Sequence, residues 1–338
     1  MRPFADLVVV ELASVLAGPS VGQFFAELGA TVLKVENPAT GGDVTRRWKL
    51  PSEPADDDRS AYFAAANWGK QSLALDLTTP DGQRVLHDLA RRADVIVASY
   101  KPGDAERLGA DAATLCARNP RLIYAHIVGY PPGSPDSERA GYDAVIQAES
   151  GFTFMNGAAD GPPVKMPVAL IDVLAAHQLK EAVLVRLWER ERTGRGGSVT
   201  VSLFESAVAA LVNQATNWLT AGHAPQRLGS EHPNIAPYGT LFPTADGHTV
   251  VLAVDGPAVR RALRRARAGR DRRRAPVRDE PAARAEPWLP QPPPRRAHRR
   301  ARPRRAARGA RRTRRAGRRG QRPPHRVRAA RRARPDRA

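Results

Sequence analysis

One aspartate, Asp172, stands where small and apolar residues pass into a long apolar helical stretch. An aspartate at a helix start is usually an N-cap, whose side chain accepts a backbone hydrogen bond and contributes about 1 kcal/mol. A carboxylate can also act as a nucleophile that forms a covalent intermediate. Position alone favours the cap, although the two roles are compatible. Since a helix N-terminus stabilises a carboxylate by roughly 0.3–1 kcal/mol, we expect Asp172 to be ionised at neutral pH.

Strand-like and helical segments alternate through the N-terminal part of the chain, and they would have to position this aspartate. Short apolar runs predict strands, and apolar residues at helical spacing predict the helices between them. Strands are expected at 7–12, 31–36, 72–77, 94–99, 122–128 and 198–203, and helices at 18–28, 79–90, 173–192 and 205–219. This alternation is typical of an α/β fold with a Rossmann-like, doubly wound parallel sheet.

The remaining segments predict loops and a hairpin. Residues 131–171 are rich in Gly, Pro and polar side chains and predict a connecting region that contributes to a site. Residues 222–237 predict a second loop. Residues 238–242 and 249–254 predict the two strands of a hairpin, because Asp246-Gly247 between them suits a tight turn.

Several short motifs resemble those of one enzyme family. They are LAGP at 16–19, GATVLKVE at 29–36, GDVTR at 42–46, NWGKQS at 67–72, PG at 102–103 with RLG at 107–109, GYD at 141–143 and GRG at 194–196. In order and spacing these motifs resemble the family III CoA transferases, the group of formyl-CoA transferase, carnitine CoA transferase and alpha-methylacyl-CoA racemase. The resemblance covers residues 4–254.

The resemblance implies a chemistry for Asp172, which matches the position of the family's nucleophile. The carboxylate would attack an acyl-CoA, giving a mixed anhydride and then an aspartyl-CoA thioester, and an incoming acid would reverse these steps. The chain is thereby expected to be an acyl-CoA:carboxylate CoA transferase. Acyl-CoA and a carboxylic acid, such as a dicarboxylic acid, would be its substrates. We expect no further cofactor and no metal.

The resemblance also implies a binding path for CoA. Ala17, Leu75, Ser99 and Tyr100 match family positions along the nucleotide and pantetheine path. Arg107 matches a position that contacts the CoA phosphates, where a charge-assisted hydrogen bond fits.

The pair Tyr142 and Asp143 matches family positions near the thioester end, and it bears on an alternative activity. The racemase branch places a histidine at the Tyr142 position, and tyrosine is a poor base near pH 7. Transfer is therefore favoured over racemisation or epimerisation. A third interpretation is an inactive relative, or a nucleic-acid-binding fusion through a basic tail.

The charge of the chain is divided sharply near residue 255. Residues 256–338 contain 32 Arg, no Lys and 5 acidic residues, a net charge of +27, whereas residues 1–255 contain 22 basic and 29 acidic residues, a net charge of −7. Such a segment has too few apolar residues to form a core. It could be a basic arm that contacts nucleic acid non-specifically or binds anionic lipid, or a disordered extension. We favour a third interpretation, the product of a shifted reading frame in a GC-rich gene.

Together these features predict three parts. Residues 1–225 are expected to form a Rossmann-like CoA-binding large domain, 226–255 the start of an incomplete small domain, and 256–338 a low-complexity, Arg/Pro-rich disordered or out-of-frame tail. The single Cys116 excludes an internal disulfide and a zinc cluster of several thiolates. With no apolar run of membrane-spanning length, we expect a cytoplasmic protein. The resemblance implies an interlocked homodimer, and without the family's C-terminal part we expect poor folding or low activity.

Overall fold

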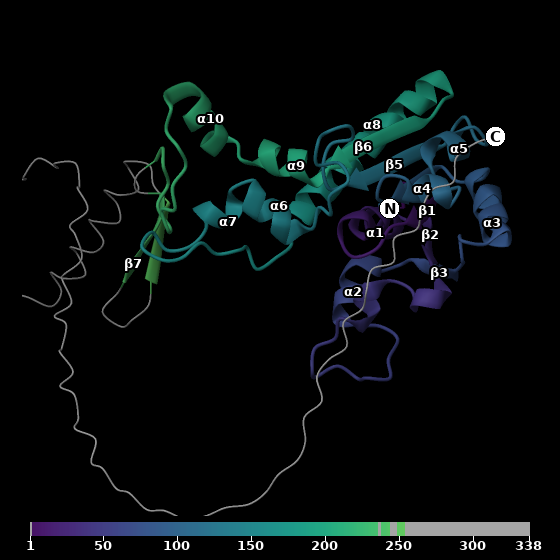
Figure 1. The fold of residues 1–338 in the computed structure, drawn as a ribbon, viewed down its shortest axis with the longest axis horizontal. Helices are drawn as coiled ribbons and strands as arrows, with labels where there is room; N and C mark the ends of the chain where they lie inside the picture. Colours follow the sequence, from purple (N-terminus) through teal and green to yellow (C-terminus); the bar gives the residue numbers. More distant parts are fainter. Residues whose placement is uncertain (1, 236–237, 244–248, 254–338) are drawn as a thin grey trace, which may run out of the picture. The chain divides into compact units, whose positions relative to one another are not determined.

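The computed structural model describes residues 2–235, 238–243 and 249–253 (Figure 1). The predicted disordered or out-of-frame tail at 256–338 lies outside these residues. Within the described part of the chain, no helix is long and apolar enough to cross a membrane.

Within these residues, six strands form one parallel sheet. They are β1 Val8–Leu12, β2 Thr31–Glu36, β3 Gln71–Ala74, β4 Val95–Ala98, β5 Ile123–Val128 and β6 Gly197–Ser202. The strands lie in the order β3-β2-β1-β4-β5-β6, so the sheet grows outward in both directions from the β1/β4 pair. This order confirms the predicted doubly wound α/β fold. A separate antiparallel pair, β7 Tyr238–Pro243 and β8 Thr249–Ala253, forms the predicted hairpin.

Helices follow most of the strands. They are α1 Ala17–Glu27, α2 Ala61–Asn67, α3 Pro80–Ala90, α4 Asp104–Arg107, α5 Ala112–Cys116, α6 Asp143–Glu149, α7 Phe152–Met155, α8 Leu170–Thr193, α9 Leu203–Ala210 and α10 Asn213–Ala221, with short 3-10 turns at Pro38–Thr40 and Val44–Arg47. The expected start at Thr79-Pro80 is confirmed, because the Thr79 hydroxyl caps α3 and Pro80 is its first residue.

Two apolar clusters cover the two faces of the sheet. Neighbouring residues of β1 point to opposite sides, so Val9 belongs to one cluster and Val10 to the other. Phe25 of α1 and Leu179 of α8 pack on the Val9 side. Leu86 of α3 and other apolar side chains of α3 and α5 pack on the Val10 side. The central strand β4 is completely buried, which explains its uninterrupted apolar sequence.

Three segments differ from the expectations. The region 131–171 contains α6 and α7, which its Gly and Pro content concealed. The single helix expected at 205–219 is two helices, because Val212 between them has a φ of +45° and interrupts the helical path. The helix expected from residue 173 begins at Leu170, one turn earlier, and the strand expected at 72–77 ends at Ala74.

Candidate active site

The carboxyl ends of the parallel strands meet along one edge of the sheet, where open α/β sheets usually bind ligands. Three adjoining hollows, of about 230, 210 and 160 Å³, lie there. Ser99, which follows β4, lines all three of them. The residues that follow the other strands also line them: Ser14 after β1, Asn37 after β2, Leu75 after β3, Gly129 after β5 and Leu203 after β6. These hollows are called the groove below.

Most of the predicted site residues line this groove. Asp172, Ala17, Tyr142 and Asp143 line the 160 Å³ hollow together with Ser99. The structure thus brings these residues together, and their role as the thioester end remains a prediction.

The predicted CoA path divides between the groove and the outer surface. Leu75 and Tyr100 line the 230 Å³ hollow, and Tyr100 also lines the 210 Å³ hollow. Arg107 does not line any of the three. It is exposed on α4, 2.9 Å from Asp104 in an ion pair, although the next residue, Leu108, does line the groove.

The backbone around Asp172 corrects the N-cap interpretation. The cap position of α8 is Ala169, and Asp172 is the third residue of the helix. The N–H of Ile171, which has no acceptor within the helix, donates to Oδ1 of Asp143 at 2.8 Å. Asp143 comes from α6, 28 residues earlier in the chain. Because this distant carboxylate satisfies the helix start, the Asp172 side chain is available to the groove.

The protonation of Asp172 also differs from the expectation. Burial, followed by the negative charge of Asp143, raises the pKa of Asp172 to about 7. The expected ionisation by the helix N-terminus is therefore wrong for the free protein, because desolvation and a like charge outweigh it. With a pKa near 7, Asp172 is only partly ionised at neutral pH.

A close contact between two glycines brings Tyr142 and Asp143 to the groove. Gly129 follows β5, and Gly141 precedes the Tyr142–Asp143 pair. A Cβ added to Gly141 would lie 2.3 Å from Cα of Gly129, and one added to Gly129 would lie 2.6 Å from Cα of Gly141. Only glycine allows the two backbones to approach in this way.

The loop opposite Asp172 is held in a strained conformation. Val15, which lines the 160 Å³ hollow, has a φ of +74°, an outlier for a β-branched residue. Its N–H donates to both carboxylate oxygens of Asp43, at 3.3 and 3.2 Å. Asp43 in turn forms a buried ion pair of 2.9 Å with Lys34. The charged core beneath the loop therefore fixes the position of Val15.

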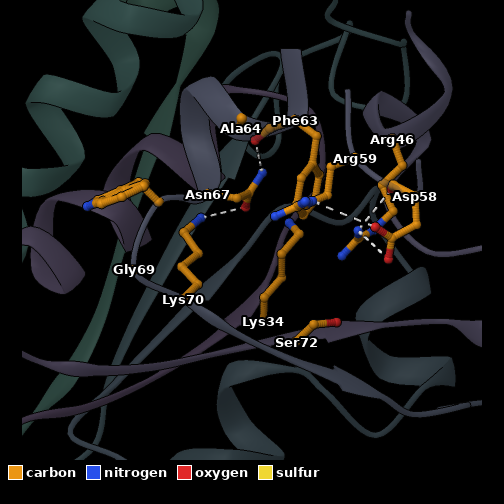
Figure 2. Close-up of a pocket in the computed structure, with 11 residues that line it drawn as sticks. Lys34, Arg46, Asp58, Arg59, Phe63, Ala64, Asn67, Gly69, Lys70 and Ser72 are labelled. Atoms are coloured by element: carbon orange, nitrogen blue, oxygen red, sulfur yellow. Dashed lines mark hydrogen bonds and ion pairs between the residues drawn. The ribbon is translucent and has the colours of Figure 1, made fainter. Parts of the chain in front are cut away.

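The same core forms the floor of a separate pocket of about 410 Å³ (Figure 2). Figure 2 shows Lys34 and Lys70 along this pocket, with the Lys70 ammonium directed to Asn67. Both lysines bind Glu11, at 2.9 and 2.6 Å, and Lys70 also donates to Asn67. Burial lowers the pKa of Lys70 to about 8. Since carboxylates compensate both buried lysines, we interpret this core as support for the Val15 loop and not as an anion site.

Two cationic residues line the groove, and the sequence interpretation named neither. Lys101 and Arg139 line the 210 Å³ hollow. Arg139 is already paired with Asp136 at 2.9 Å and with Glu149. Among the residues that the structure describes, Lys101 forms no ion pair within 4 Å. Lys101 directly follows Ser99 and Tyr100, two predicted CoA-binding residues, and this position in the sequence could have identified it.

Comparison with known proteins decides the family. The sequence model described as CoA-transferase family III matches residues 4–297. The chain belongs to this family. The resemblance inferred from the motifs is confirmed, and the match continues beyond residue 254, where that resemblance ended.

Individual relatives agree with this assignment. The chain is 42% identical over 255 residues to the succinate–glutarate CoA-transferase of Agrobacterium fabrum, covering 75% of this chain and 63% of the relative. It is 35% identical over 253 residues to the human succinyl-CoA:glutarate CoA-transferase, covering 75% and 57%. The chain thus spans about 60% of the length of these curated relatives.

Solved structures show the same fold. The CAIB/BAIF family protein from Brucella suis matches with a TM-score of 0.70 and 39% identity, over 78% of this chain and 69% of that protein. A protein from Mycobacterium tuberculosis matches with a TM-score of 0.67 and 34% identity, over 78% and 68%.

Proposed function

We propose that this chain transfers CoA from an acyl-CoA to a carboxylic acid, with Asp172 as the nucleophile. The observation that carries the proposal is the half-buried Asp172 carboxyl in the 160 Å³ hollow, with its pKa raised to about 7. Membership of CoA-transferase family III supports it. A desolvated, more basic carboxylate is a stronger nucleophile than one in water, and part of the population is ionised at neutral pH.

The reaction proceeds through two kinds of acyl intermediate on Asp172. The carboxylate attacks the thioester carbonyl, and the carbon–sulfur bond breaks. CoA leaves as the thiolate, and the donor acyl group remains on Asp172 as a mixed anhydride. The thiolate attacks the Asp172 carbonyl of the anhydride, which releases the donor acid and leaves an aspartyl-CoA thioester. An incoming carboxylate attacks this thioester and expels CoA thiolate. The thiolate then attacks the acyl carbon of the new anhydride, which gives the product thioester and regenerates Asp172.

Backbone groups beside Asp172 can stabilise the oxyanions of these steps. Ala17 and Gly18 open α1 and line the same hollow as Asp172. The first N–H groups of a helix have no acceptor within it, so they are suited to a developing negative charge. We assign this role to the N–H groups of Ala17 and Gly18.

The rest of the groove would bind the nucleotide and pantetheine parts of CoA. Leu75 and Tyr100 provide the partly apolar wall of the 230 Å³ hollow for the nucleotide and pantetheine. Lys101 supplies positive charge for a phosphate. A contact between Arg107 and a phosphate remains a prediction, and it would compete with the Asp104 ion pair.

The experiment measures exchange of a labelled carboxylic acid into its CoA thioester. Succinyl-CoA and glutarate are the first pair to test, because relatives are named for these substrates. We expect Asp172→Ala to abolish exchange while CoA affinity stays nearly unchanged. The matched control is Asp111→Ala, which removes an aspartate that caps α5 through the Thr114 N–H at 2.8 Å.

The control separates the loss of a nucleophile from the loss of a helix-capping aspartate. Asp111→Ala should cost about 1 kcal/mol of stability and leave exchange intact. Undiminished exchange in Asp172→Ala would refute the proposal. Deuterium incorporation at the alpha carbon without acid exchange would instead point to a racemase.

We further propose a cytoplasmic homodimer. Apolar side chains exposed on α10 support a partner surface: Trp218 and Leu219 are 56% and 78% exposed. Exposed apolar surface of this kind marks an interface or favours aggregation. Sedimentation of the purified chain distinguishes a dimer from a monomer or an aggregate, and an aggregate would accord with the expected poor folding.

For residues 256–338 we propose a shifted reading frame, on the grounds of their Arg, Ala and Pro composition. The nucleotide sequence, translated in all frames from codon 254 onward, tests this. The region up to codon 297 needs particular attention, because the family match extends that far. A family-like continuation in another frame supports the proposal, and its absence from every frame contradicts it.

A further inference from the structure

Gln147 of α6 is a completely buried polar side chain close to the groove, although it does not line it. Its side-chain amide makes three hydrogen bonds. Nε2 donates to Oδ2 of Asp143 at 2.6 Å and to the carbonyl of Val168 at 3.3 Å. Oε1 accepts from the N–H of Met166 at 2.9 Å. A buried amide with both ends occupied is fixed in its orientation.

These bonds connect the two segments that meet at Asp172. Met166 and Val168 belong to the irregular segment that leads into α8. Asp143 holds the first turn of α8 through the N–H of Ile171 at 2.8 Å. One glutamine therefore ties the segment before the helix to the carboxylate that satisfies the helix start.

We propose that Gln147 is a positioning residue that orients Asp143 and residues 166–171, so that the first turn of α8 presents Asp172 to the groove. This inference rests on the proposed function of Asp172 and adds to it. The short bond from Nε2 also fixes where the Asp143 carboxylate lies beside Asp172.

The substitution Gln147→Met tests this role, because it keeps the length of the side chain and removes all three hydrogen bonds. The carboxylate of Asp143 is then no longer held beside Asp172, and the weaker repulsion lowers the pKa of Asp172. We expect kcat to fall between about tenfold and 100-fold, because small misplacements of a nucleophile have effects of that size. KM for acyl-CoA should stay within about twofold, since Gln147 does not line the groove.

A matched control is Gln178→Met on α8. Gln178 accepts a hydrogen bond from the Ser206 hydroxyl at 2.9 Å, so the variant removes a comparable polar contact away from Asp143. We expect wild-type kcat and an unchanged pKa of Asp172 in this variant. Equal losses in both variants would overturn the proposal, since they would indicate a general loss of packing.

A second variant, Gln147→Glu, keeps the acceptor for Met166 and covers the case in which Gln147→Met does not fold. When the new carboxyl is protonated it can donate to Asp143, and when it ionises it repels Asp143. The ratio of variant to wild-type kcat should therefore approach one at acid pH and fall as the pH rises. A ratio that does not depend on pH would overturn the proposal.

Carboxyl-carbon NMR separates this inference from the proposed function. The Asp172 signal, identified by its loss in Asp172→Asn, reports the pKa of Asp172 without any turnover. If the wild-type chain transfers no CoA, the proposed function fails, while a lower pKa of Asp172 in Gln147→Met would still support the positioning role. An unchanged pKa in that variant would overturn the positioning role, whatever the activity.

Discussion

Replacing Asp172 with asparagine should stabilise the fold, and increasingly so as the pH rises. Burial and Asp143 raise the pKa of Asp172 from 3.8 to about 7. Because the folded state binds this proton more tightly, the group favours folding below pH 3.8, and this contribution is lost as the pH rises through about 7. Asparagine carries no charge at any pH and removes this dependence.

The magnitude follows from the size of the pKa shift. A shift of about three units corresponds to about 4 kcal/mol once both states are ionised. About 2 kcal/mol of this is already lost at about pH 5 and nearly all of it at about pH 8.5. The free energy of unfolding of Asp172→Asn minus that of wild type should therefore grow by about 2 to 3 kcal/mol between these two pH values.

Urea denaturation at the two pH values measures this difference. A constant offset from the asparagine amide cancels, because only the change with pH is compared. The control is Asp111→Asn, since the Thr114 contacts lower the pKa of Asp111. Asp111 is thus ionised in both states across this pH range, so its offset should be flat. A flat offset for Asp172→Asn as well would refute the raised pKa and the explanation of nucleophilicity built on it.

Three further tests concern residues that line the groove. Val15→Gly and Val212→Gly both relieve a positive φ worth about 1–2 kcal/mol, so thermal melts should show similar changes in stability. Only Val15→Gly should lower kcat, because only Val15 lines the groove. Equal kcat values in the two variants would contradict this. Lys101→Ala should raise KM for acyl-CoA by about tenfold, which is the effect of losing one charged hydrogen bond. Arg107→Ala should raise KM by less. A larger increase in Arg107→Ala would instead place the phosphate at Arg107. Gly141→Ala should lower the free energy of unfolding by about 2 kcal/mol and abolish transfer, because the added Cβ would lie 2.3 Å from Cα of Gly129. A stable and active variant would contradict this.

The sheet and the place of Asp172 could be predicted because they depend on local patterns. Apolar runs and helical spacing identify the strands, and a doubly wound order then places their carboxyl ends along one edge. Asp172 lies at the start of the longest helix, which its apolar periodicity reveals. The motif resemblance led to Ala17, Ser99, Tyr142 and Asp143, which the structure brings to the same hollow.

What could not be predicted depends on contacts between distant residues. The helix start at α8 is satisfied by Asp143, 28 residues away, so the N-cap interpretation of Asp172 was wrong although it was reasonable locally. The strain at Val15 depends on Asp43, also 28 residues away. The break at Val212 has no glycine or proline to signal it, since the sequence there continues in an apolar, helical pattern.

Asp143 contributes both to the raised pKa of Asp172 and to its placement. It holds the first turn of α8 through Ile171, and its negative charge adds to burial, the larger cause, in opposing ionisation of Asp172. A neutral residue that capped Ile171 equally well would place Asp172 in the same position with a lower pKa and a weaker nucleophile. In the Gln147→Met background, where no Nε2 donor faces the new amide, Asp143→Asn is that residue, because its side-chain oxygen can still accept from Ile171. Compared with Gln147→Met alone, it should keep the contact with Ile171 while lowering the basicity of Asp172, and transfer should slow without any loss of acyl-CoA binding.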